Sequence, residues 1–186
     1  MFKYLIFIAI CVYGIPAQQT GIGRCPKVDV QKNFDLNAYL GTWYEAEKYL
    51  EFIELGGKCI EAIWSVDENN TIHVIEQMIN AKLNFVIKGH DIVKPAGNPN
   101  EGKFEVFTGG VPFGAPYWVL ETDYKNYSVV FSCTQVSLIN AKFAWILTRE
   151  RKPSEEVLAK AHAVFDKYHL SKDLLKTNQE NCPGNF

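Results

Sequence analysis

The fold is decided within one run of the chain: Asn33-Phe34-Asp35-Leu36-Asn37-Ala38-Tyr39-Leu40-Gly41-Thr42-Trp43-Tyr44-Glu45. Its first half predicts a single helical turn, because Asp35 can accept a backbone N–H as an N-cap. Gly41 ends that turn, and the β-branched and aromatic residues after it predict a strand. An indole just after a glycine suits the narrow end of a barrel, where ring and backbone approach closely. An ordinary strand start is the alternative for so short a motif.

Two later stretches favour the barrel. Thr122-Asp123-Tyr124 closes one expected strand and opens a turn, and Leu147-Thr148-Arg149 closes the last one. With the first run, and in this order, they resemble the three signature regions of the lipocalins. The resemblance is greatest to the apolipoprotein D-like members and the insect bilin-binding proteins, and it extends from about residue 25 to 182. The segments that carry it are Asn33–Tyr44, Pro116–Tyr127 and Phe143–Leu147.

This resemblance implies an all-β fold. The expected architecture is an eight-stranded antiparallel up-and-down barrel with one C-terminal α-helix packed on its wall. Such a calyx carries a small hydrophobic ligand in its cavity.

The N-terminus has the features of a secretory signal peptide. Lys3 stands near the start, an apolar run covers Tyr4–Tyr13, and Ala17 provides a small-residue exit, with cleavage after Gly14 as a close alternative. The run is too short for a good membrane span. Removing 17 of the 186 residues leaves 169, which fits one lipocalin domain over residues 18–186. Loss of Lys3 changes the net charge from −2 to about −3, and nothing indicates nucleic-acid binding.

Cysteine usage agrees with secretion. Cys11 leaves with the signal, and the remaining cysteines are Cys25, Cys59, Cys133 and Cys182. An even number in an oxidising compartment predicts two disulfides, and spacing alone permits three pairings. The resemblance implies Cys25–Cys133 and Cys59–Cys182, each worth about 4–5 kcal/mol in the chain-entropy model. Gln135 stands where apolipoprotein D has an unpaired cysteine, which argues against a thiol-linked dimer, and a monomer is expected.

Alternation of apolar and polar residues predicts consecutive strands from Trp43 onward. The expected strands after the first are Lys58–Asp67, Thr71–Ile79, residues 83–94, Lys103–Phe107, Pro116–Glu121, Ser128–Thr134 and Lys142–Arg149. Their even spacing favours an antiparallel meander of eight strands, which can close around one small ligand. Pro153 and Ser154 then begin an amphipathic helix with apolar residues at helical spacing up to Tyr168.

Catalysis and metal binding have little support. The histidines His73, His90, His162 and His169 are widely separated, and alternation points the first two outward. None forms zinc-ligand spacing with a nearby carboxylate, so no metal or haem site is predicted. All mature cysteines are expected in disulfides, and no serine has an evident base. The protein is therefore not expected to be an enzyme, and no catalytic residue is predicted.

The inward-facing side chains of the expected strands are the predicted ligand-binding residues. They are Trp64, Val74, Glu76, Met78, Phe104, Val106, Tyr117, Phe143, Trp145 and Leu147. The resemblance supports this alternation, since the residues matching Trp64, Tyr117, Trp145 and Leu147 line the pocket of apolipoprotein D. The alternative is that these aromatics only fill a solid core.

Two features depart from a purely apolar lining. Glu76 stands where apolipoprotein D has an amide. If Glu76 is partly buried, desolvation would raise its pKa, or it would accept a hydrogen bond from a ligand N–H or hydroxyl. The alternative is that it points into water at the rim. At the closed end, Arg149 matches the lipocalin arginine that lies over the signature tryptophan, here Trp43. The resemblance therefore assigns Trp43 and Arg149 to stability.

Two surface features complete the prediction. Asn69-Asn70-Thr71, in an expected hairpin turn, and Asn126-Tyr127-Ser128 are N-glycosylation acceptors, with lower occupancy expected at Asn126. The connections Leu50–Gly57, Thr108–Ala115 and Gln135–Asn140 should meet at the open end and are rich in apolar residues. They are expected either to contact a lipid or lipoprotein surface or to fold back as a lid.

The predicted function is that of a secreted lipocalin that binds and transports a small hydrophobic ligand of sterol, fatty-acid, retinoid or bilin type. No cofactor is expected unless the ligand is a bilin. The alternatives are a bilin-binding pigment protein and a lipid-surface antioxidant or lipoprotein-associated factor.

Overall fold

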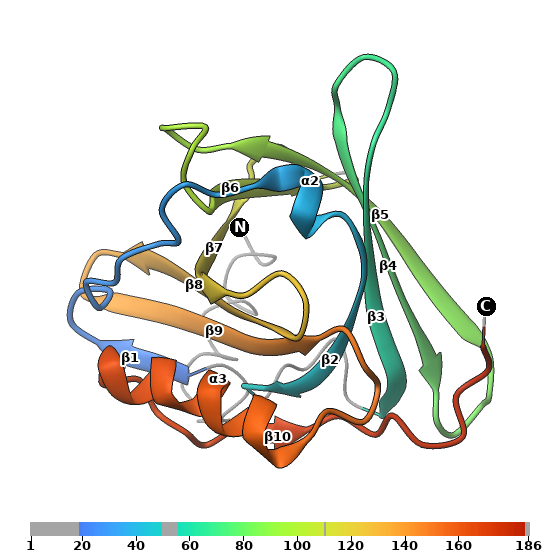
Figure 1. Ribbon diagram of the computed structural model, residues 1–186. Helices are drawn as coiled ribbons and strands as arrows, with labels where there is room; N and C mark the ends of the chain where they lie inside the picture. The colour runs from blue at the N-terminus through green and yellow to red at the C-terminus, as the bar shows by residue number, and fades with distance from the viewer. Residues whose placement is uncertain (1–18, 50–55, 110, 185–186) are drawn as a thin grey trace, which may run out of the picture.

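The computed structural model describes residues 19–49, 56–109 and 111–184, and the expected signal peptide lies outside them. The elements in chain order (Figure 1) are β1 Gln19–Ile22, α2 Leu36–Tyr39, β2 Gly41–Lys48, β3 Gly57–Val66, β4 Ile72–Asn80, β5 Val86–Pro95, β6 Lys103–Thr108, β7 Ala115–Thr122, β8 Tyr127–Val136, β9 Ile139–Thr148, α3 Glu155–Lys167 and β10 Leu175–Lys176. In these described ranges, no helix combines the length and the apolar character that crossing a membrane requires.

Strands β2 to β9 form a closed barrel. Each pairs antiparallel with the next, and β9 pairs back with β2, with Tyr44 opposite Thr148 and Lys48 opposite Trp145. Alternate side chains therefore point into the barrel and out of it. The predicted all-β class and eight-stranded antiparallel meander are confirmed.

The opening run of the sequence builds the closed end. Asp35 caps α2 by accepting from the Ala38 N–H at 3.1 Å. Gly41 has a φ of 94°, a left-handed conformation that glycine adopts without strain, and the chain turns there into β2. The Trp43 ring is fully buried, and its N–H donates to the Tyr39 carbonyl at 2.8 Å.

Arg149 lies across this end of the barrel. Its guanidinium carbon is 3.7 Å from the centroid of the Trp43 ring. Its N–H groups donate, at 2.8–3.2 Å, to five backbone carbonyls, those of Ala38, Tyr39, Leu40, Thr42 and Tyr124. Because α2 is a single turn, its last carbonyls lack helical partners, and Arg149 supplies them.

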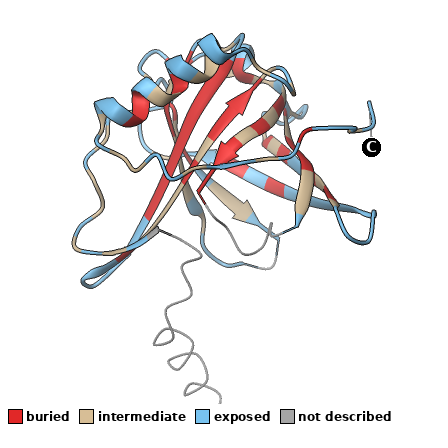
Figure 2. Ribbon diagram, turned by 90° about the horizontal axis from the view of Figure 1, so that it is seen from below, coloured by how far each residue is buried: buried red, intermediate tan, exposed pale blue. Residues whose placement is uncertain are grey.

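Helix α3 covers one outer wall of the barrel. Ser154 accepts from the Val157 N–H at 3.3 Å, so α3 begins directly after the predicted start. Its buried residues Ala161, Val164 and Phe165 pack with outward-facing side chains of β8 and β9 in a second core outside the barrel. Figure 2 shows α3 lying over strands composed largely of buried residues. The predicted helix on the wall is confirmed.

The two disulfides join the terminal segments to the barrel. Cys25 is bonded to Cys133 on β8, and Cys59 on β3 is bonded to Cys182. The Cα atoms of the two pairs are 5.9 Å and 5.6 Å apart, within the usual range for a disulfide. These are the pairs that the resemblance implies.

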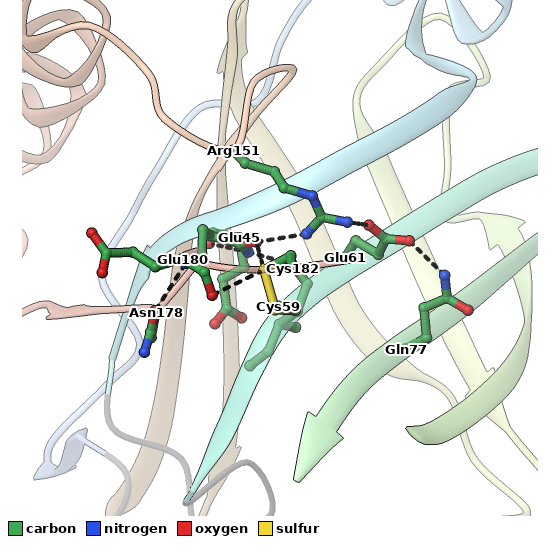
Figure 3. The surroundings of a disulfide bond; sticks show 10 residues. Glu45, Cys59, Glu61, Gln77, Arg151, Asn178, Glu180 and Cys182 are labelled. Atoms are coloured by element: carbon green, nitrogen blue, oxygen red, sulfur yellow. Dashed lines mark hydrogen bonds and ion pairs between the residues drawn. A yellow bond between two sulfur atoms is a disulfide. The ribbon is translucent and has the colours of Figure 1, made fainter. Parts of the chain in front are cut away.

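The C-terminal segment fills a gap between β2 and β3. The pairing of these strands ends at Tyr44 opposite Glu61, and beyond it β10 pairs with β2 instead. The Gln179 side-chain amide bridges the gap by donating to the carbonyls of Glu45 at 3.0 Å and Ile60 at 2.7 Å. Figure 3 shows the polar network beside the Cys59–Cys182 bond, in which Arg151 is ion-paired with Glu61 and Gln77 donates to the same carboxylate. The tail therefore forms part of the barrel wall.

Some boundaries differ from the prediction. β5 begins at Val86, and the preceding residues form a turn in which Leu83 and Phe85 are exposed, because Asn80 accepts the backbone N–H groups of Lys82 and Leu83. The short strands β1 and β10 were not predicted, since each is recruited by a barrel edge and has no alternation of its own.

We predict that Asn69 carries an N-glycan and that Asn126 is modified less. Asn69 is exposed in the β3–β4 turn, which Asp67 holds by accepting the N–H groups of Asn69 and Thr71. At the second acceptor, the Asn126 side-chain N–H donates to Asp123 at 2.6 Å and Ser128 is fully buried. Peptide mapping of protein recovered from culture medium, before and after glycosidase, measures both occupancies, with Asn69→Gln as the control. Unmodified Asn69 in that protein would refute the prediction.

Candidate functional site

The barrel encloses a cavity of about 330 Å³ to which all eight barrel strands contribute. The lining residues are Trp43, Glu45, Ile60, Glu61, Ala62, Trp64, Val74, Glu76, Asp91, Val106, Thr108, Ala115, Pro116, Tyr117, Ser132, Thr134, Phe143, Trp145 and Leu147. Most are apolar or aromatic, and the charged members are acidic.

Eight of the ten predicted ligand-binding residues lie on this lining: Trp64, Val74, Glu76, Val106, Tyr117, Phe143, Trp145 and Leu147. Phe104 does not lie on the lining, which differs from the prediction. Phe104 points inward but packs against Phe34 and Trp64, with ring centroids 5.3 Å and 5.8 Å apart, so it belongs to the core below the cavity. Met78 also lies off the lining, near the end of β4 where it pairs with Ile87.

Three aromatic rings form one wall of the cavity. The rings of Phe143 and Trp145 are nearly parallel, at 8° and 6.0 Å between centroids. Tyr117 continues the row, 6.4 Å from Trp145 at 22°. Such a row gives this wall of the cavity a continuous aromatic surface.

The Tyr117 hydroxyl on the lining belongs to a hydrogen-bonded group of three hydroxyls. The Tyr39 hydroxyl lies 3.2 Å from the Tyr117 hydroxyl and 3.0 Å from Ser128 Oγ. Burial raises the pKa of Tyr39 to about 12 and the pKa of Tyr117 well above its ordinary value. Trp43, which was assigned only to stability, also borders the cavity.

Four carboxylates lie on the lining, of which only Glu76 was predicted. Glu45 is ion-paired with Lys48 at 2.9 Å, and Glu61 is ion-paired with Arg151. Asp91 was missed, although alternation along β5 places it on the same side as buried Val93. It pairs with Val74 in the β4–β5 register, which brings it next to Glu76 on the diagonal.

Glu76 lies on the cavity lining. Its exposed surface therefore faces the interior of the barrel, and the walls of the barrel surround it. Burial, reinforced by the charges of Asp91 and Glu45 and opposed by Lys48, raises its pKa from 4.5 to about 7. Gly89 lies opposite Glu76, and a Cβ at this position would make only ordinary van der Waals contact with the Glu76 Cβ, at 4.0 Å.

The expectation that the histidines stay apart from each other and from carboxylates is wrong for three of them. His162 Nε2 lies 2.7 Å from a carboxylate oxygen of Glu47, outside the cavity lining. The other two, His73 and His90, contact each other. His73 Nδ1 lies 3.0 Å from His90 Nε2, and His73 Nε2 lies 3.1 Å from Asp67. The antiparallel register of β4 and β5 places the two rings on the same diagonal. They lie on the outer side of their strands, and this cluster is separate from the cavity.

In the part of the chain that the structure describes, no group of three or more histidine, cysteine or acidic side chains is placed to hold a metal ion. The four described cysteines are all in disulfides. What the geometry supports is burial of an apolar ligand against an aromatic wall, near two carboxylates.

A barrel sealed at one end around a largely apolar cavity defines a small-molecule carrier. The chain belongs to the lipocalin family: the model of the lipocalin / cytosolic fatty-acid binding protein family matches residues 40–181. It is thus a protein that binds and transports a small hydrophobic ligand.

Individual relatives agree with this assignment. The chain is 40% identical over 169 residues to apolipoprotein D of Macaca fascicularis, covering 89% of this chain and 88% of the relative. It is 31% identical over 153 residues to a bilin-binding protein of Pieris brassicae, covering 80% and 79%. Among solved structures, insecticyanin from the tobacco hornworm Manduca sexta has the same fold, with a TM-score of 0.76 at 23% identity over 87% of this chain and 89% of that one.

We predict that Glu76→Gln stabilises the ligand-free protein in a pH-dependent way. The pKa of Glu76 is higher in the folded protein than in the unfolded chain, so the folded protein keeps this proton at pH values where the unfolded chain has lost it. The free energy of unfolding therefore falls as the pH rises from 4.5 to about 7. The variant should be more stable by about 1 kcal/mol at pH 8, below the full conversion of the shift because cavity solvent screens the charge. At pH 4.5 the difference should be small.

Urea unfolding at both pH values measures this effect. Glu105→Gln, on the exposed outer side of β6, is the matched control and should give no such pH dependence. An equal effect of Glu76→Gln at both pH values would contradict the raised pKa.

Proposed function

We propose that this lipocalin is a secreted carrier whose ligand is a largely planar hydrophobic molecule held against the Phe143–Trp145–Tyr117 wall. The parallel arrangement of these three rings is the observation that carries the proposal. A flat ligand can contact all three at once, whereas a flexible chain would lose more conformational entropy to do so. Burial of its apolar surface then supplies most of the affinity.

Secretion is supported by chemistry and by the sequence. Two disulfides persist in an oxidising compartment. The expected signal peptide over residues 1–17 lies outside the described residues and would deliver the chain to the secretory pathway. We further propose that the protein acts by binding and not by catalysis, as a monomer.

A bilin is the second candidate ligand. A bilin is extended and conjugated, and its pyrrole N–H groups need acceptors when they are buried. Glu76 and Asp91 could accept them while the aromatic wall contacts the conjugated plane, so the residues fit the group. A bound bilin would supply strong visible absorption, and the purified protein would then be blue-green. The relative in Pieris brassicae is named for bilin binding.

The open end supports contact with a lipid or lipoprotein surface. Phe113 in the β6–β7 connection is 71% exposed, and Leu138 in the β8–β9 connection is 70% exposed. The exposure of both side chains favours contact with a partner surface over the alternative, a lid folded back onto the cavity. Leu83 and Phe85, in the β4–β5 turn, add to the same end because alternate connections of a meander lie together. The apolar residues of the first connection, over positions 50–55, lie outside the described residues.

For the ligand site, we predict that Trp145→Ala weakens binding of a planar hydrophobic probe such as retinol by about 2–4 kcal/mol, the range found at binding hot spots. Trp118→Ala, which removes an indole from the outer face of the neighbouring wall, is the control and should leave affinity unchanged. Fluorescence titration measures both variants, and far-ultraviolet circular dichroism checks their fold. Equal affinity of Trp145→Ala and wild type would remove Trp145 from the site.

For the open end, we predict that the protein co-floats with neutral phospholipid vesicles even at high salt, because burial of apolar surface is not screened as ion pairs are. The double variant Phe113→Ser and Leu138→Ser should lose flotation. Ile75→Ser with Ile92→Ser removes two half-exposed apolar side chains from the barrel wall and should retain it. If wild type does not float, or if both double variants float equally, the lipid contact is wrong.

A further inference from the structure

The cavity lining is largely apolar, but it also carries several carboxylates that binding of an apolar ligand does not explain. Among the lining residues that the structure describes, four are carboxylates and none is basic. Two of these carboxylates have cations beside them: Lys48 for Glu45, and Arg151 for Glu61. Glu76 and Asp91 are different, because the structure gives neither an ion pair. Lys48 acts on Glu76 only at longer range, while its ammonium lies 2.9 Å from Glu45.

Asp91 provides a second, independent observation. Its side chain is only 4% exposed, yet its Oδ1 has no hydrogen-bond partner among the described residues. Thr108 lies directly across the β5–β6 pair and opposes the rise that burial causes in the pKa of Asp91, but Oδ1 remains without a partner. A buried polar atom without a partner is costly, and such atoms in native proteins usually have one that belongs to a ligand or to water.

The strand register brings the two carboxylates together. Glu76 pairs with Gly89 and Val74 pairs with Asp91, so the acids are diagonal neighbours on adjacent strands. Diagonal positions in an antiparallel pair lie about 7–8 Å apart at the backbone, close enough for one group to contact both side chains. Gly89, which has no side chain, leaves the space beside Glu76 open.

We propose that Glu76 and Asp91 form a cation-selecting end of the cavity, and that the preferred ligand is a hydrophobic molecule carrying a protonated amine. This inference rests on the proposed carrier function and specifies its ligand class. An ammonium group has three N–H donors and no acceptor, which suits two neighbouring carboxylates, one of them with an unfilled oxygen. A ligand carboxylate would add a third negative charge to the same low-dielectric region and is disfavoured.

A matched ligand series tests the proposal. Retinylamine, retinol and retinoic acid share one apolar body and differ in charge at one end. At pH 8, the amine should bind wild type about 10- to 100-fold more tightly than the acid, the range that hydrogen bonds to charged groups give. Glu76→Gln and Asp91→Asn should each narrow that ratio, and together should bring it close to one. Glu105→Gln, on the outer face of β6, is the control and should keep the wild-type ratio.

Proton release provides a second readout that a structural role would not change. The bound ammonium favours the ionised form of Glu76, so amine binding near pH 7 should release protons, as calorimetry in two buffers of different ionisation enthalpy measures. Glu76→Gln should lose this release.

The results distinguish failure of the cation-selecting end from failure of the carrier function. If all three retinoids bind with equal affinity and Trp145→Ala weakens all three, the carrier function stands and the cation-selecting end is wrong. Tighter binding of the acid would also overturn it. If none of the three binds wild type, the proposed function fails and this inference fails with it.

Discussion

The guanidinium of Arg149 holds together the parts of the chain that meet at the closed end of the barrel. It lies on the Trp43 ring and donates to carbonyls of α2, of the start of β2 and of the β7–β8 turn, while its own backbone follows the last barrel strand. A single-turn helix has little stability of its own, and here its terminal carbonyls depend on one side chain from far along the sequence. Because this end of the barrel is sealed, a ligand has to enter the cavity from the opposite, open end. The loops with exposed apolar residues lie at that open end.

Much of this architecture is predictable from the sequence, since its strands face water on one side. Alternation correctly identified the inward faces of β4, β6, β7 and β9, and the helix cap at Ser154 was evident from local chemistry. Depth in the barrel was not predictable. Phe104 and Val106 share a face, yet one lies in the core below the cavity and the other on its lining. That difference depends on how strands are staggered around the barrel, which pairs residues far apart in the chain.

The dependence on strand register also explains why other contacts were not predicted. The contact between His73 and His90 and the approach of Asp91 to Glu76 are cross-strand diagonals, fixed by register and by no local pattern. Strands β1 and β10 exist because barrel edges recruit them, so their own residues carry little signal. Asp91 is a partial exception, because it shares a strand face with buried Val93, so alternation along β5 carries a signal for it.

The two disulfides place a demand on biosynthesis. Each joins cysteines more than a hundred residues apart, and the two loops overlap, since Cys59 lies between Cys25 and Cys133. A chain that enters the secretory compartment from its N-terminus exposes Cys59 to Cys25 well before Cys133 arrives, and Cys182 comes last. Vectorial synthesis therefore offers the first thiol a non-native partner, and the second native bond has to wait for the tail that completes the wall between β2 and β3. If a Cys25–Cys59 bond forms during this interval, thiol–disulfide exchange has to reverse it before the two native bonds can form.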